Sequence, residues 1–152
     1  MSIKFSTGAM AAILSTGSMR SVFANGVMRI FSGPQVVDAD ASETGEILTE
    51  VTLSGGAFTP GATTNGLNFG TTTDSTIAKA PAETWLGNFI KDGTMGWFRF
   101  YDNSRTTGAS TSAVRIDGRV GTSRADIIVV TTAATVGGSV SFNDFKFDFT
   151  II

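Results

Sequence analysis

The sequence predicts an all-β protein, folded as an antiparallel β-sandwich with a short N-terminal helix or arm. The clearest strand signal is residues 139–152, where apolar and polar side chains alternate with a period of two. The alternation shifts by one position at Asn143-Asp144, which indicates a β-bulge in an otherwise continuous strand. A second sheet is needed to cover the four phenylalanines of this strand, Phe142, Phe145, Phe147 and Phe149.

The length and charge favour one domain with an unusually neutral surface. The chain has 152 residues, of which 16% are charged, and its formal net charge is −2. We expect an arm or short helix over residues 1–20 and a single β-sandwich domain over residues 21–152. The balance of charge provides no basic surface for a nucleic acid or for an anionic membrane.

The residue types exclude several kinds of chemistry. The chain contains no cysteine and no histidine, so it lacks disulfides, thiolates, imidazole bases and the usual zinc ligands. Its glycines form no phosphate-binding loop, and its lysines lie beside no nucleophile motif. We therefore expect a protein without cofactor or metal that is not an enzyme. The N-terminus has no secretory signal and no segment is long enough to span a membrane, so we expect synthesis in a cytoplasm.

Residues 7–14 form the most plausible helix, with Thr7 as its N-cap. A helix this short is marginal in isolation and needs a docking partner for its apolar side chains. These are Met10, Ile13 and Leu14, which could pack on the protein's own sandwich or on a neighbouring subunit.

The remaining elements are strands separated by Gly, Pro and Asn turns. Alternation predicts strands over residues 27–31, 47–53, 96–102 and 113–120, with a short strand within 67–73 and a weak one over 76–80. In 47–53 the odd positions face inward and Leu48 is ambiguous. Residues 83–90 fit a helix or a strand, and the apolar run 127–130 predicts a strand covered on both faces.

Three segments carry polar groups that permit more than one interpretation. Trp97, Arg99 and Tyr101 share one face of their strand and form either a ligand platform or a face packed under a loop or a neighbouring subunit. The acidic stretch 38–43 is either a solvated loop or a calcium loop. Arg115, Asp117 and Arg119 are expected to form a charged ladder on the surface, in a strand that continues through Asp117-Gly118 rather than turning there.

Three motifs together resemble small virion structural proteins of tailed bacteriophages. They are Asn25-Gly-Val-Met-Arg-Ile-Phe-Ser-Gly33, Gly96-Trp-Phe-Arg-Phe-Tyr-Asp102 and the stretch from Ala113 to Ile127. The resemblance covers nearly the whole chain in the same order, and its motifs describe strands and turns rather than catalytic residues.

The resemblance implies a capsid decoration (cement) protein with a jelly-roll-like sandwich. Such a protein forms a homotrimer on the major capsid protein, at the outer surface of the virion. The expected protein interface comprises Met10, Ile13, Leu14, Trp97, Arg99 and Tyr101. Two alternatives are a tail or fibre adsorption subunit and a carbohydrate-binding module that would use Trp85, Trp97 and Tyr101.

Overall fold

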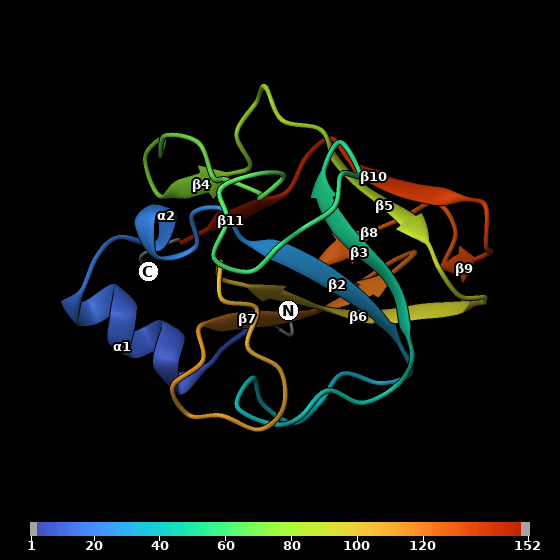
Figure 1. Ribbon diagram of the computed structural model, residues 1–152, viewed down its shortest axis with the longest axis horizontal. Coiled ribbons are helices and arrows are strands. Elements are labelled where there is room, and N and C mark those ends of the chain that lie inside the picture. The colour runs from blue at the N-terminus through green and yellow to red at the C-terminus, as the bar shows by residue number, and fades with distance from the viewer. Residues whose placement is uncertain (1–2, 150–152) are drawn as a thin grey trace.

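The computed structural model describes residues 3–149 and contains two short helices and eleven strands within that range (Figure 1). The all-β antiparallel prediction is confirmed. The elements are β1 (Lys4–Phe5), α1 (Thr7–Ser15), α2 (Met19–Val22), β2 (Val27–Ser32), β3 (Ile47–Leu53), β4 (Thr76–Ala78), β5 (Trp85–Phe89), β6 (Gly93–Tyr101), β7 (Arg115–Gly121), β8 (Ile127–Ile128), β9 (Ala133–Ala134), β10 (Ser139–Phe142) and β11 (Lys146–Asp148).

Most strands belong to one sheet with the order β1-β7-β6-β2-β3-β5-β10. The short strands β8 and β9 join it beside β7 and β6, and only β8 among these strands runs parallel to its neighbour. A second sheet of the described residues contains β4 and β11. The jelly-roll topology is not confirmed, because the strands are divided unequally between one large and one two-stranded sheet.

The core lies on one face of the large sheet. Strand register pairs Met28 with Phe100 and Ile30 with Phe98, and directly opposed residues point to the same face. The aromatic side chains of Phe69, Phe145 and Phe147 cover this face from the second sheet and its neighbouring loop. The fold is therefore two-layered, with phenylalanine supplying much of the contact between the layers.

Strand β7 runs straight through Asp117-Gly118, as predicted. A Cβ atom at Gly118 would lie 2.4 Å from the ring of Phe98 on the adjacent strand. Glycine is thus required at position 118 because its backbone packs closely against an aromatic ring. Asp117-Gly118 resembles a hairpin turn in sequence, but it lies inside a continuous strand.

The C-terminal strand is the main correction to the predicted elements. The chain forms β10, which pairs with β5, and then β11, which pairs with β4 in the other sheet. The shift at Asn143-Asp144 is therefore the point where the chain changes sheets rather than a bulge in one strand. This change lets Phe142, Phe145 and Phe147 face one core from both layers. Residues 150–152 lie outside the described part of the chain.

Several smaller expectations are also resolved. Residues 85–89 form a strand, whereas 67–73 contribute isolated bridges rather than a strand. A bulge between β2 and β3 turns Leu48 into the core. The run 127–130 is covered on one side only, since Ile127 is buried but Val130 is fully exposed.

The N-terminal segment packs on its own domain. β1 pairs with β7, and Ala9 of α1 is buried in the core. The N-cap of α1 is Ser6 rather than Thr7, because the Ser6 Oγ accepts the Ala9 N–H at 3.1 Å and also donates to the Ala113 carbonyl at 2.7 Å. Neither helix described in residues 3–149 is long and apolar enough to cross a lipid bilayer.

Candidate protein-binding surface

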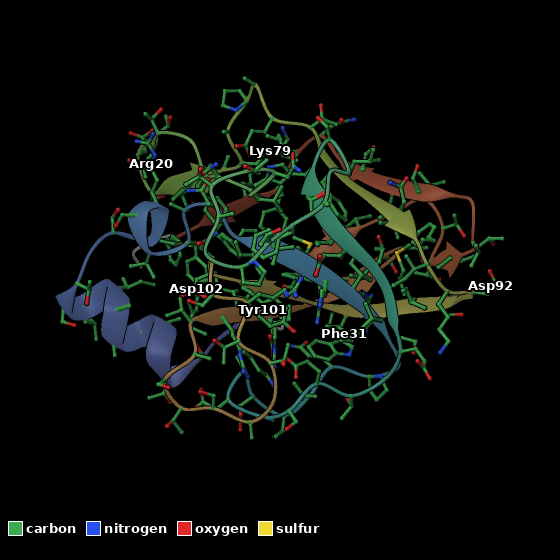
Figure 2. All side chains as sticks on the ribbon, in the orientation of Figure 1. Arg20, Phe31, Lys79, Asp92, Tyr101 and Asp102 are labelled. Carbon is green, nitrogen blue, oxygen red and sulfur yellow. The ribbon has the colours of Figure 1, made fainter. Side chains whose placement is uncertain are left out.

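The predicted interface residues separate into two groups in the structure. Trp97, Arg99 and Tyr101 lie on the outer face of β6 and have no solvent-exposed area. The loops 33–46 and 102–114 cover them, and Figure 2 shows Phe31 and Tyr101 on the side of the sheet where these loops lie. The expectation that they form an exposed interface is wrong, and the alternative of a face packed under a loop is confirmed.

Aromatic packing accounts for the burial of Trp97. Its indole stacks on Phe31 with 4.5 Å between ring centroids, and its Nε1–H donates to the Thr44 carbonyl at 3.3 Å. Trp85 is buried as well, in the core on the other face of the sheet. The three aromatic residues suggested for carbohydrate stacking therefore offer no exposed platform.

An ion pair between Arg99 and Asp117 forms the centre of the covered face. The guanidinium donates from Nε and Nη2 to the two carboxylate oxygens at 2.7 and 2.8 Å, and both side chains are fully buried. The same guanidinium donates to the Ala41 carbonyl at 2.9 Å. Asp117 therefore belongs to the interior, and the expected surface ladder of charges is wrong at this position.

Arg115 is the second buried arginine of the covered face. It donates to loop carbonyls of Thr106, Gly108 and Ala39 at distances from 2.6 to 3.3 Å. These carbonyls belong to both covering loops, so a single side chain holds the two loops on the sheet. Arg119, the remaining member of the expected ladder, is exposed.

Glu43 joins the acidic loop to the same network. Its carboxylate accepts the Tyr101 hydroxyl at 2.7 Å and the Gly108 N–H at 2.8 Å, and lies 3.2 Å from Arg99. Asp40 instead accepts two hydrogen bonds from Thr7 at the start of α1. The carboxylates of the loop thus have separate partners, and the described residues contain no metal-binding group of three or more.

The groups around Glu43 lower the pKa of its carboxyl. Burial alone would raise the pKa of Glu43, but the Gly108 N–H, the Tyr101 hydroxyl and Arg99 outweigh burial and hold this pKa below its ordinary value of 4.5. Burial raises the pKa of Tyr101, so its hydroxyl stays protonated and donates to Glu43.

Replacing Glu43 with glutamine should weaken the dependence of stability on acid. A carboxylate with a lower pKa in the folded state stabilises the fold above its unfolded pKa, and this contribution is lost as the pH falls through the folded pKa. The wild-type free energy of unfolding should therefore fall more steeply below pH 4.5 than that of Glu43→Gln, as measured by urea unfolding at a series of pH values. Glu46→Gln, at an exposed glutamate, is the control, and equal slopes for all three proteins would contradict the prediction.

The second group of predicted residues borders an apolar groove. Met10 and Ile13 of α1 line it, whereas Leu14 is 79% exposed at the end of the helix. The groove has a volume of about 770 Å³ and lies between the two helices and the region of β4. We call it the N-terminal groove, and its other apolar lining residues are Phe5, Met19, Ile77 and Phe149.

Sequence reasoning missed two features of the surface. Phe149 borders the N-terminal groove and is 48% exposed, although its alternation pattern predicted a buried position. Glu50 forms ion pairs with Arg29 and Arg105 at 2.8 and 3.0 Å beside the covered face. The facing positions of Arg29 and Glu50 on β2 and β3 could have been found only from the register of the two strands.

The fold and these surfaces define an all-β protein with an internally satisfied ionic face and an exposed apolar groove. Comparison of the chain with protein-family models, with curated proteins and with solved structures finds no match.

Proposed function

We propose that this chain is a non-enzymatic structural protein of a bacteriophage virion, namely a capsid decoration protein that binds the major capsid protein and stabilises the shell. The observation that carries the proposal is the apolar surface of α1 beside the N-terminal groove. Met10 is 44% exposed and Leu14 is 79% exposed. An apolar patch rimmed by polar residues is typical of a protein–protein contact.

The buried ionic face supports a structural role. The guanidinium of Arg99 donates hydrogen bonds to Asp117 and to a loop carbonyl, and that of Arg115 donates to loop carbonyls. Among the described residues, no buried side-chain nitrogen or oxygen lacks a hydrogen-bond partner. Groups engaged in this way stabilise loops and suit a protein whose task is to remain rigid on a surface.

The sequence resemblance supplies the virion assignment and the partner. A decoration protein would form a homotrimer, and light scattering should then give three times the chain mass of 15.8 kDa. The low charge of the chain suits contacts made without desolvating ions.

Substituting Leu14 with aspartate should abolish most shell binding while leaving the fold intact. The test uses shells of the encoding phage that lack this protein, and it measures the amount of added protein that sediments with them. A carboxylate placed in an apolar contact loses its hydration, so we expect at least about a tenfold loss of affinity. Val37→Asp is the matched control, because Val37 is 77% exposed and lies on the loop 33–46 rather than on α1.

The copy number in purified particles tests the location. Hundreds of copies per virion would support shell decoration, whereas a dozen or fewer would favour the neck or tail. Absence of the protein from purified particles would overturn the virion assignment. Equal shell binding by wild type and Leu14→Asp would overturn the role of the α1 surface.

A further inference from the structure

The large sheet ends at an unprotected strand. β10 is the last strand in the sheet order and pairs with β5 on one side. Phe89 N–H donates to the Gly138 carbonyl at 2.9 Å, and the register then assigns Val140 and Phe142 to the hydrogen bonds with β5. The backbone groups of Ser139 and Ser141 consequently point away from β5, towards the free side of the strand. We call this side the β10 edge.

Exposed β-branched side chains lie next to the β10 edge. Val130 is fully exposed, and Ile128 is 59% exposed. A shallow groove of about 300 Å³ is lined both by this segment and by Ser139, Val140 and Ser141 of β10. Residues 127–130 have the apolar composition of a strand that is covered on both faces, but in this protein only the face that carries Ile127 is covered.

Two common protections of an exposed edge, charged side chains and proline, are missing here. Proteins commonly block free edges with charged side chains or proline, which prevent pairing with another chain. Residues 127–143 contain neither a charged residue nor a proline. Two copies of this edge could therefore approach without like charges opposing each other. The free backbone N–H and C=O groups of an antiparallel edge are complementary to the same groups of a second copy.

We propose that the β10 edge binds a second copy of this chain by antiparallel pairing of β10 with its counterpart about a two-fold axis. Ser139 and Ser141 exchange backbone hydrogen bonds with the same strand of the partner subunit. The pairing makes the two large sheets continuous and covers Ile128 and Val130 at the contact. This interface is isologous and is separate from the N-terminal groove, so it does not depend on the proposed function. Pairing through it gives the mass of two chains, or of two trimers where the proposed homotrimer forms.

Disulfide cross-linking tests the pairing directly, because the natural chain has no cysteine. The variant Ser139→Cys/Ser141→Cys should form covalent dimers under mild oxidation, since paired antiparallel strands bring Cα atoms within disulfide range. Ser104→Cys/Thr106→Cys has the same spacing on an exposed loop away from β10 and should remain monomeric on a denaturing gel. Equal cross-linking of the two variants would overturn the proposal.

Light scattering with a charge variant provides the second test. Val130→Lys places two ammonium groups at the contact and should raise the dimer dissociation constant at least about tenfold. Val37→Lys, at a comparably exposed valine, should behave as wild type. Wild type that is monomeric at every concentration would overturn the edge pairing. A trimer that neither cross-links through β10 nor responds to Val130→Lys would also overturn it, while leaving the proposed function intact.

Discussion

Replacing Asp117 with alanine should lower the free energy of unfolding by about 3–5 kcal/mol, because the substitution leaves the guanidinium of Arg99 buried without its main counter-charge. Both side chains are fully buried and joined by two hydrogen bonds of 2.7 and 2.8 Å. Glu43, at 3.2 Å from Arg99, compensates only in part. Urea unfolding followed by circular dichroism at neutral pH measures the loss.

Two variants make this prediction specific to the buried pair. Asp144→Ala removes an exposed carboxylate whose ion pair with Lys146 is long, at 3.8 Å, and should change stability by less than about 0.5 kcal/mol. Arg99→Met combined with Asp117→Leu removes both charges and should be less destabilising than Asp117→Ala alone. A double variant that is less stable than the single one would show that the pair itself supplies the net stability.

Replacing Phe145 with alanine should destabilise the protein by a similar amount, about 3–5 kcal/mol. Phe145 lies at the point where the chain passes from β10 to β11. Its ring contacts aromatic rings of both layers, with centroid distances from 5.1 to 6.5 Å, and the neighbours are Phe69, Trp85, Phe98, Phe100 and Phe147. Truncation would open a cavity among rigid rings that cannot collapse into it.

Phe149→Ala is the matched control for Phe145→Ala. Phe149 carries the same side chain four residues later, but it is 48% exposed and borders the N-terminal groove. Its truncation should cost less than about 1.5 kcal/mol, because less apolar area leaves the water when the chain folds. A similar decrease in the free energy of unfolding for Phe145→Ala and Phe149→Ala would contradict the prediction, because it would show that burial in the core does not determine the destabilisation.

Asp117→Ala and Phe145→Ala test the two opposite faces of the large sheet. The core face of the large sheet is apolar and depends on packing, whereas the opposite face holds arginines that fix two long loops. A chain with only 16% charged residues thus places several of its charges in the interior.

Local patterns were sufficient to predict the principal strands. The predicted strand 47–53 has the same bounds as β3, and 27–31 differs from β2 by one residue. The predicted strands 96–102 and 113–120 overlap β6 and β7 with shifts of one to three residues at their ends. These predictions succeeded because side-chain alternation reflects the two faces of a strand, and that property is carried by neighbouring residues alone.

The candidate site was only partly predictable. Met10 and Leu14 are exposed on α1, and their contact with a partner remains a prediction. Trp97, Arg99 and Tyr101 were correctly assigned to one face of a strand, but whether that face is open depends on loops distant in sequence. Arg99 meets Ala41 across 58 residues, and no local pattern contains that contact.

Composition and side-chain alternation alone predict the all-β class and the main strands, and they leave the chain without cysteine or histidine chemistry. Three features became visible only in the folded protein: the C-terminal stretch divides between two sheets, Arg99 and Asp117 are interior, and Val130 is exposed. Alternation specifies two faces of a strand but not what covers each face. Covering a face requires segments far apart in the chain to meet, and their meeting is set by packing of the whole fold.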